Sequence, residues 1–155
     1  MLKIKPFRQK AGLCGPAVLK MVLKYYGIEK SEDELAILTN CDPEKGIGGE
    51  QMLLSARELG MEGYIEDNAT LEDLEELVLK QQIPVIVDWF SVDDGHYGVV
   101  VDIDKENIYL QDPEIGHVKA MKRNQFFRVW FDFPGDYLAS RDDLTIRRMI
   151  VIVNK

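Results

Sequence analysis

The spacing of apolar residues predicts a helix directly after Cys14. Apolar side chains recur there at intervals of three or four positions, which is the pattern of one buried helical face. They are Ala17, Val18, Met21, Val22 and Tyr25. The pattern predicts a helix over residues 15–26, with Gly27 as its left-handed end.

Three further helices are predicted in the first half of the chain. Ser31 and Glu34 form a capping box, so a helix should follow and run to about residue 39. Residues 50–59 place apolar side chains on one face and are followed by Gly60, a typical helix stop. A fourth helix should begin at Thr70 and carry an acidic outer face.

Six short segments rich in β-branched and apolar residues predict strands. They cover residues 61–65, 83–90, 96–101, 107–111, 117–121 and 148–153. A short helix over residues 123–130 should turn Phe126, Phe127 and Trp130 toward the core. Because helices come first and most strands later, the order predicts an α+β fold, with N-terminal helices packed on an antiparallel sheet.

Length and charge restrict the classes of function. A chain of 155 residues is expected to form a single domain, 1–155, with a core that needs neither metal nor disulfide. Its 19 basic and 27 acidic residues give a net charge of −8, which disfavours nucleic acid as a partner. No apolar run is long enough for stable membrane insertion and residues 1–7 do not resemble a secretory signal, so a cytoplasmic location is expected.

Cys14 lies at the start of the first predicted helix. Pro16 fits only in a first helical turn, where its missing N–H costs nothing, so Cys14 falls at or just before the N-terminus. The unpaired N–H groups and the positive end of the helix dipole favour a thiolate there. Cys14 is therefore the candidate nucleophile, and Gly15 leaves room for a substrate carbonyl beside it.

A thiolate nucleophile needs a base, and the chain contains two histidines. His96 opens a predicted strand after the turn-like residues 91–95. A hairpin turn through residues 104–107 would pair this strand with the next one, which ends at Asp112. Counting back from that turn places His96 and Asp112 near the same end of the ladder. Asp112 could then orient the imidazole, as in a nucleophile, base and orienter triad.

Other interpretations of the same residues stay open. His117 is a rival base, although its position after a turn is more typical of an exposed strand residue. Cys41 could form a disulfide with Cys14, but it is more typical of a small apolar side chain at a helix end. A zinc site built from the two cysteines and two histidines lacks the paired ligand spacing of such sites. The glycine-rich residues 40–49 are either a plain linker or the rim of a substrate cleft.

Four short motifs resemble a known family. They are Gln9, the run Cys14-Gly15-Pro16-Ala17, the pair His96-Tyr97 and the pair Asp112-Pro113. In this order they resemble the bacteriocin-processing cysteine peptidases of the papain-like group, over residues 9–130. Those enzymes cut leader peptides after a double glycine and are usually the N-terminal domain of an ABC exporter. Leu13 differs from the family pattern, in which many members carry Asp directly before the cysteine.

The resemblance implies a papain-like cysteine peptidase fold and a role for each motif residue. Cys14 would be the nucleophile and His96 the general base. Asp112 would orient His96, and Gln9 would donate to the oxyanion beside the Cys14 backbone N–H. No cofactor or metal is implied. The implied partners are a peptide or protein substrate and a separate ABC exporter.

The residues and the resemblance together favour thiol-dependent acyl transfer, with peptide-bond hydrolysis as the first hypothesis. Cleavage after Gly-Gly comes from the resemblance alone. One alternative keeps the same triad but acts as an acyltransferase or amidase. Another is a module that binds a peptide or leader without cutting it, although the joint presence of Cys14, His96 and Asp112 argues against an inert module.

Overall fold

The structure is a computed structural model that describes residues 1–90 and 95–155, so most of the turn predicted at 91–95 lies outside the described part. Its five α-helices are α1 (Cys14–Tyr25), α2 (Glu32–Leu38), α3 (Gly49–Glu58), α4 (Leu71–Glu75) and α5 (Arg123–Val129). A π-helical turn over Glu76–Lys80 continues α4, and a 3-10 turn covers Arg141–Asp143. Within the described residues, no helix combines the length and apolar character needed to cross a bilayer.

The strands form one large antiparallel sheet and a small two-stranded ladder. The large sheet has the order β1-β8-β2-β3-β4-β5, with every neighbouring pair antiparallel. Its strands are β1 (Met61–Glu66), β2 (Val85–Phe90), β3 (Gly95–Ile103), β4 (Asn107–Asp112), β5 (His117–Lys122) and β8 (Met149–Asn154). The ladder joins β6 (Phe131–Asp132) to β7 (Thr145–Ile146).

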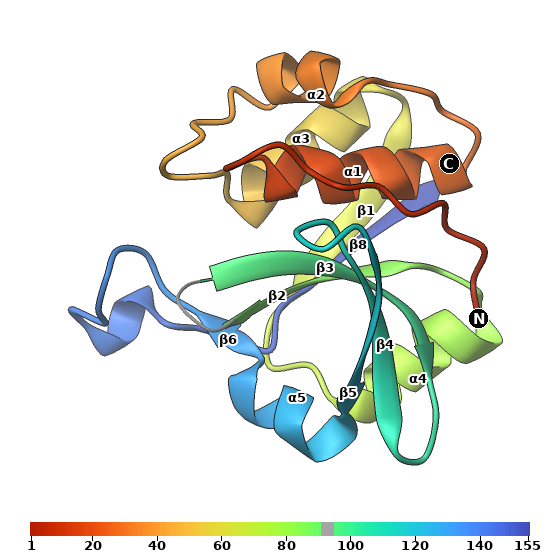
Figure 1. Cartoon of the computed structure of the whole chain (residues 1–155), viewed down its shortest axis with the longest axis vertical. Helices are drawn as coiled ribbons and strands as arrows, with labels where there is room; N and C mark the ends of the chain where they lie inside the picture. The colour runs from red at the N-terminus through yellow and green to blue at the C-terminus, as the bar shows by residue number, and fades with distance from the viewer. Residues whose placement is uncertain (91–94) are drawn as a thin grey trace.

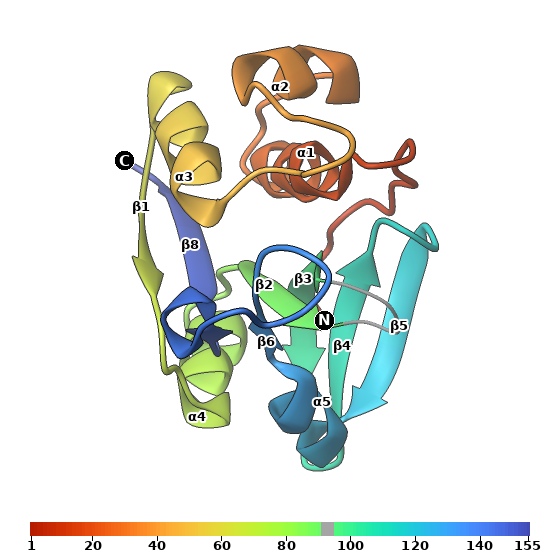
Figure 2. The same cartoon turned by 90° about the vertical axis from the view of Figure 1, so that its left-hand side faces the viewer.

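The sheet lies between two groups of helices. Helices α1, α2 and α3 lie together on one side of it, whereas α4 and α5 lie on the other (Figures 1 and 2). The alternation of side chains along β3 supplies both cores: Val99 and Val101 pack with the α1 group, and Val100 packs with Phe126 and the residues around it. Strand β3 is thereby buried on both faces, which fixes the position of the residues at its start.

These elements confirm the predicted α+β fold with the Cys14 helix packed on an antiparallel sheet. The capping box at Ser31 is present, with the Ser31 hydroxyl accepting from the Glu34 N–H at 3.0 Å. The short ladder β6–β7 was not predicted, since each of its strands has two residues. The prediction that Phe127 faces the core is wrong, because Phe127 is 40% exposed and stacks under the Arg147 guanidinium instead.

This difference between two adjacent phenylalanines gives a stability prediction. Phe126 is fully buried beside Trp130, with ring centroids 5.1 Å apart. We expect Phe126→Ala to lower the free energy of unfolding by about 3–5 kcal/mol, because it removes buried area and leaves a cavity. The matched variant Phe127→Ala should cost no more than about 1 kcal/mol, the worth of an exposed cation–π contact. Urea unfolding of both variants checks this, and equal losses would contradict the core assignment.

Candidate active site

Cys14 is the first residue of α1, close to the position that the sequence predicts. The residue before it, Leu13, is buried and makes no side-chain cap, so the first-turn N–H groups of α1 receive no capping oxygen from Leu13. Pro16 lies in the first turn, where it removes no helical hydrogen bond. Cys14 is a free thiol and is half-buried, so its sulfur is partly accessible to a ligand.

His96 and Asp112 lie at the same end of a hairpin. Strands β3 and β4 pair antiparallel, with His96 near the start of β3 and Asp112 at the end of β4. His96 Nε2 lies 2.5 Å from Asp112 Oδ1, and both residues are about 95% buried. The Glu114 backbone N–H donates to the same Oδ1 at 2.9 Å, which holds the carboxylate in place. The hairpin therefore brings together the two residues that the sequence paired.

The imidazole of His96 also has the Cys14 side chain as a hydrogen-bond partner. Burial disfavours the charged ring, but the hydrogen bonds to Asp112 and Cys14 outweigh it and raise the pKa of His96 to about 10. Burial likewise works against the Asp112 carboxylate, yet its bond to His96 leaves the pKa of Asp112 lowered. Because Nε2 faces Asp112, Nδ1 is the ring nitrogen left for the sulfur. The arrangement favours the charged imidazolium form of His96 between Asp112 and Cys14.

Trp89 packs on the imidazole and keeps this pair away from solvent. Trp89 and His96 are paired residues of β2 and β3, and their rings meet edge to face with centroids 5.8 Å apart. Trp89 is 3% exposed, and the ammonium of Lys119 lies over its ring at 5.3 Å. A bond between two buried polar groups is stronger when water is excluded, so Trp89 supports the bond from His96 to Asp112.

The segment before α1 is tied to both halves of the site. The Gln9 backbone N–H donates to the Pro113 carbonyl at 2.8 Å, directly after Asp112. The Lys10 backbone N–H donates to the carboxylate of the buried Glu32 in α2 at 3.0 Å. The Gln9 amide itself is turned to its own neighbour: Nε2 donates to the Lys10 carbonyl at 3.3 Å, and the buried Oε1 has no hydrogen-bond partner among the described residues. The structure thus brings Gln9 to the site with one of its two amide N–H donors bonded to the Lys10 carbonyl.

Cys41 and His117, the other cysteine and histidine considered from the sequence, have backbone carbonyls as their hydrogen-bond partners. His117 is exposed on β5, and its Nδ1 lies 3.0 Å from the Val118 carbonyl. Cys14 and Cys41 are both free thiols, so the considered disulfide is not formed. Cys41 is half-buried and its Sγ lies 3.8 Å from the Gly12 carbonyl oxygen. Burial, followed by the charge of Cys14, raises the pKa of Cys41.

One group of potential metal ligands overlaps the candidate site. Among the described residues, His96, Asp112 and Glu114 bring their ligand atoms within 4.8 Å of one another. This set differs from the zinc ligands considered from the sequence. Glu114 Oε2 is 3.6 Å from His96 Nε2, and its side chain is 63% exposed. Since His96 Nε2 and Asp112 already share a close hydrogen bond, the group is satisfied without an ion.

A cavity of about 650 Å³ adjoins the site on the side of the glycine-rich loop. Glu44, Lys45 and Ile47 of that loop line it, together with residues of β2, β3 and the segment after β6. The Tyr97 hydroxyl donates to the Ile47 carbonyl at 2.9 Å, which fastens the loop to β3. The interpretation of residues 40–49 as a plain linker is therefore wrong, and the alternative, the rim of a cleft, agrees with the structure.

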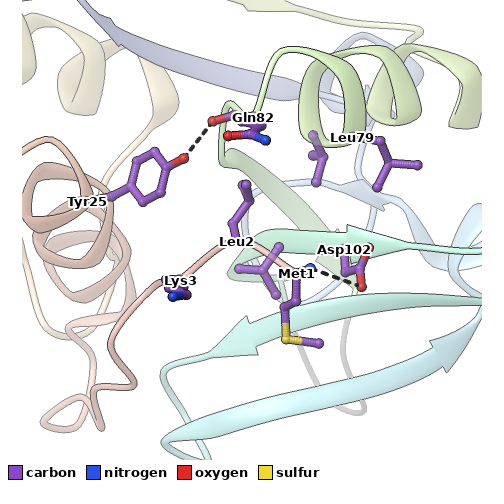
Figure 3. A pocket seen from close by; sticks show the side chains of 9 residues that line it. Met1, Leu2, Lys3, Tyr25, Leu79, Gln82 and Asp102 are labelled. Carbon is purple, nitrogen blue, oxygen red and sulfur yellow. Dashed lines mark hydrogen bonds and ion pairs between the residues drawn. The ribbon is translucent and has the colours of Figure 1, made fainter.

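A second cavity, of about 390 Å³, lies beside the N-terminal arm (Figure 3). The Tyr25 hydroxyl donates to the Gln82 carbonyl at 2.8 Å there, and the Met1 amine lies 3.7 Å from Asp102. Neither cysteine and neither histidine lines this cavity. Its lining lacks the cysteine and histidine that thiol chemistry requires, so the candidate chemistry belongs to the Cys14 side.

Sequence reasoning missed several residues that shape the site. Asp88 is 8% exposed in β2 and shares a hydrogen bond with Asp132 through their carboxyl groups. The sequence does contain a signal for Asp88, because it is the one charged residue in the otherwise apolar run 83–90. Glu32 lies in the predicted capping-box segment, and nothing in its local pattern predicts that it binds the Lys10 backbone. The sequence pattern predicts Trp89 only as a residue of a buried strand.

Comparison with known proteins identifies the family and the fold of the chain. Residues 7–133 match the family model described as the Peptidase C39 family. Two relatives named only as uncharacterized proteins come from Methanothermobacter marburgensis, 33% identical over 85% of this chain and 84% of the relative, and Methanothermobacter thermautotrophicus, 32% identical over 81% and 80%. The peptidase domain of Streptococcus ComA, a bi-functional ABC transporter of a quorum-sensing pathway, has a TM-score of 0.77 at 22% identity, covering 99% of this chain and 100% of that one.

Two more solved structures share the fold. A double glycine motif protease from an AMS/PCAT transporter, solved in complex with the leader peptide, has a TM-score of 0.72 at 20% identity over 99% of this chain and 94% of that one. A putative C39-like peptidase from Bacillus anthracis has a TM-score of 0.70 at 16% identity over 97% and 95%. The fold is thus that of papain-like C39 peptidase domains, and the family match covers most of the chain. This chain belongs to the peptidase C39 family of cysteine peptidases.

Proposed function

We propose that this protein hydrolyses peptide bonds, with Cys14, His96 and Asp112 as its catalytic residues. One observation carries the proposal: His96 is hydrogen-bonded to the Cys14 side chain and is held through Nε2 by a buried carboxylate at 2.5 Å. A sulfur, an imidazole and an orienting acid in this order form the arrangement that nucleophilic acyl transfer requires. The family match supports the same chemistry.

The proposed reaction begins with attack of the Cys14 thiolate on the scissile carbonyl carbon, which forms a C–S bond and pushes the carbonyl electron pair onto oxygen. The oxyanion collapses, the C–N bond breaks, and His96 gives its proton to the leaving amine. Water then attacks the thioester while His96 takes one of its protons. The acid product leaves, and the Cys14 thiolate is restored beside the imidazolium.

The oxyanion of both steps would lie beside the Cys14 backbone N–H at the start of α1. The Gln9 amide is the proposed second donor. In the present arrangement its Nε2 bonds to the Lys10 carbonyl at 3.3 Å, which is a long and weak bond. Substrate binding would have to exchange this bond for one to the oxyanion, by rotation of the Gln9 side chain alone.

The proposed substrate is a peptide with a double-glycine leader, and a separate ABC exporter is the proposed partner. Support comes from the solved relatives, of which one is a double glycine motif protease bound to a leader peptide and another is the peptidase domain of an ABC transporter. Gly15, the residue after Cys14, is covered by Ile47, since an added Cβ would lie 2.5 Å from Ile47 Cγ1. The space that the sequence predicted beside Gly15 for a substrate carbonyl is therefore occupied by this side chain.

The test is cleavage of a synthetic peptide that contains Gly-Gly, followed by mass spectrometry of the products. We expect one cut after the second glycine by the wild-type protein, and a much slower cut when the pair is replaced by two valines. Binding of the peptide without any product, under conditions where Cys14 is reduced, would contradict hydrolysis and favour a module that only binds. Transfer of the acyl group to added hydroxylamine without free acid would favour the acyltransferase alternative.

A further inference from the structure

We infer that the 650 Å³ cavity beside Cys14 binds a cationic side chain of the peptide substrate, lysine or arginine, between the carboxyl groups of Asp88 and Asp132. The inference rests on the proposed function, because it assigns a specificity pocket to the same site. It also goes beyond that function, since a double glycine presents no side chain that could occupy such a cavity.

The cavity lies next to both members of the candidate catalytic pair, Cys14 and His96. Gly95 and Tyr97, which precede and follow His96 on β3, both line it. Ile47 lines it as well, and the Ile47 side chain lies directly against Gly15, the residue after Cys14. A peptide whose carbonyl carbon meets the sulfur therefore has the mouth of this cavity within reach of a neighbouring side chain.

A pair of carboxyl groups forms the charged part of the lining. Asp88 comes from β2 and Asp132 from β6, and the two carboxyl groups are hydrogen-bonded to each other. Asp132 Oδ1 also accepts the Phe133 N–H at 2.7 Å. A Cβ on Gly95 would lie 2.1 Å from Asp132 Oδ1, so the carboxyl group lies directly on the backbone beside His96. The missing side chain at Gly95 leaves the space that Asp132 occupies.

Two adjacent carboxyl groups, one buried and one half-buried, repel each other when both are ionised, and either a shared proton or a cation relieves that repulsion. Burial first, and then the neighbouring Asp132, raise the pKa of Asp88 well above its usual range, so this carboxyl group holds its proton more tightly than an exposed aspartate does. A lysine ammonium or an arginine guanidinium can replace that proton and leave both groups ionised around one cation. Binding would then release a proton to solvent.

The rest of the lining favours the same ligand. Glu44 and Asp136 add two acidic groups, and Lys45 adds one basic group. The Arg148 guanidinium also lines the cavity, but it donates to both carboxylate oxygens of Asp67, at 2.7 and 3.0 Å. The described lining therefore has more acidic than basic groups, and the charge of Arg148 is already balanced by Asp67.

Apolar groups of the cavity fit the carbon stem of such a side chain. Ile47, Phe133 and Pro134 line it beside the acidic pair. The Phe133 ring stacks on Phe90 with centroids 5.3 Å apart, which makes a flat apolar wall. Lysine and arginine side chains commonly bury their methylenes on such surfaces while the charged end reaches a carboxylate.

The test uses peptidyl chloromethyl ketones that alkylate Cys14 with loss of chloride, in matched pairs with lysine or norleucine at the first, second or third residue from the reactive carbon. Mass spectrometry gives the rate of Cys14 modification. At one of these positions we expect lysine to react at least about tenfold faster than norleucine, as a desolvated charge pair would give. In Asp88→Asn this ratio should fall to within about threefold of unity, because the amide keeps the size of the carboxyl group but not its charge.

Glu58→Gln, an exposed acid on α3 that does not line the cavity, is the matched control and should keep the wild-type ratio. Asp132→Asn supplies a second variant if Asp88→Asn does not fold, and its ratio should also fall. Equal rates for lysine and norleucine at every position in the wild type, or an unchanged ratio in a folded variant, would overturn the inference. Alkylation needs no turnover, so a protein that shows the lysine preference yet hydrolyses no peptide would overturn the proposed function and leave the pocket assignment standing.

Discussion

Cys14→Ala is expected to lower kcat/KM for a peptide substrate by at least about 10³-fold, because the thioester pathway loses its nucleophile and only binding and oxyanion stabilisation remain. Cys14 is half-buried at the start of α1, and alanine is a good helix former there, so the fold should survive the change. Steady-state cleavage kinetics together with a thermal melt measure activity and folding on the same sample.

Cys41→Ala is the control for this change. Cys41 is also half-buried, but its sulfur donates a weak hydrogen bond to the Gly12 carbonyl at 3.8 Å and is not the partner of His96. We expect this variant to keep kcat/KM within about threefold of the wild type, as for substitutions away from a reacting group. If Cys41→Ala removed activity while Cys14→Ala kept it, the assignment of the nucleophile would be wrong.

The second large effect is expected at Asp112. Asp112→Ala removes the acceptor that holds His96 Nε2 at 2.5 Å and leaves a buried ring without its orienting partner. We expect kcat to fall by about 10²–10⁴-fold, the range seen when a triad acid is lost. Asp112→Asn keeps an acceptor oxygen and should retain more of the activity. Cleavage kinetics of the two variants at one pH near neutrality check this order, and full activity of Asp112→Ala would contradict the role of orienter.

The wild-type protein and Asp112→Asn give a prediction for the pH dependence of activity. The pKa of His96 is raised to about 10, so the imidazolium predominates in the folded protein at neutral pH and is lost as pH rises through about 10. Activity that needs the imidazolium as acid should therefore decline on the alkaline side. Asp112→Asn removes one of the anions that raise this pKa, so its alkaline decline should begin at lower pH. An alkaline limb at the same pH in both proteins would contradict the electrostatic account.

Local patterns were sufficient to predict most of the fold. The helix after Cys14 follows from apolar spacing and from Gly27, and the hairpin β3–β4 follows from two β-branched runs around a polar turn. The two-residue strands β6 and β7 have no periodicity to detect. The inward face of α5 was mistaken at Phe127 because neighbouring aromatic residues satisfy more than one helical phase, and only the tertiary position of Arg147 separates them.

The candidate site was predictable where one hairpin and one helix start define it. His96 and Asp112 are 16 residues apart on adjacent strands, so counting from the turn brings them together. Asp88 of β2 and Asp132 of β6 are 44 positions apart in the sequence, and no local pattern predicts their contact. The present engagement of the Gln9 amide depends on a side-chain rotamer, which spacing does not determine.

The most direct test of the central claim, that Cys14 and His96 act as one unit, is the rate of Cys14 alkylation by iodoacetamide against pH in the wild type and in His96→Ala. We expect the wild-type protein to react rapidly well below pH 8, down to about pH 6, because the imidazolium stabilises the thiolate. The folded His96→Ala variant should react slowly there and gain rate only near about pH 8.5, as an ordinary thiol does. Two coincident curves would contradict the account.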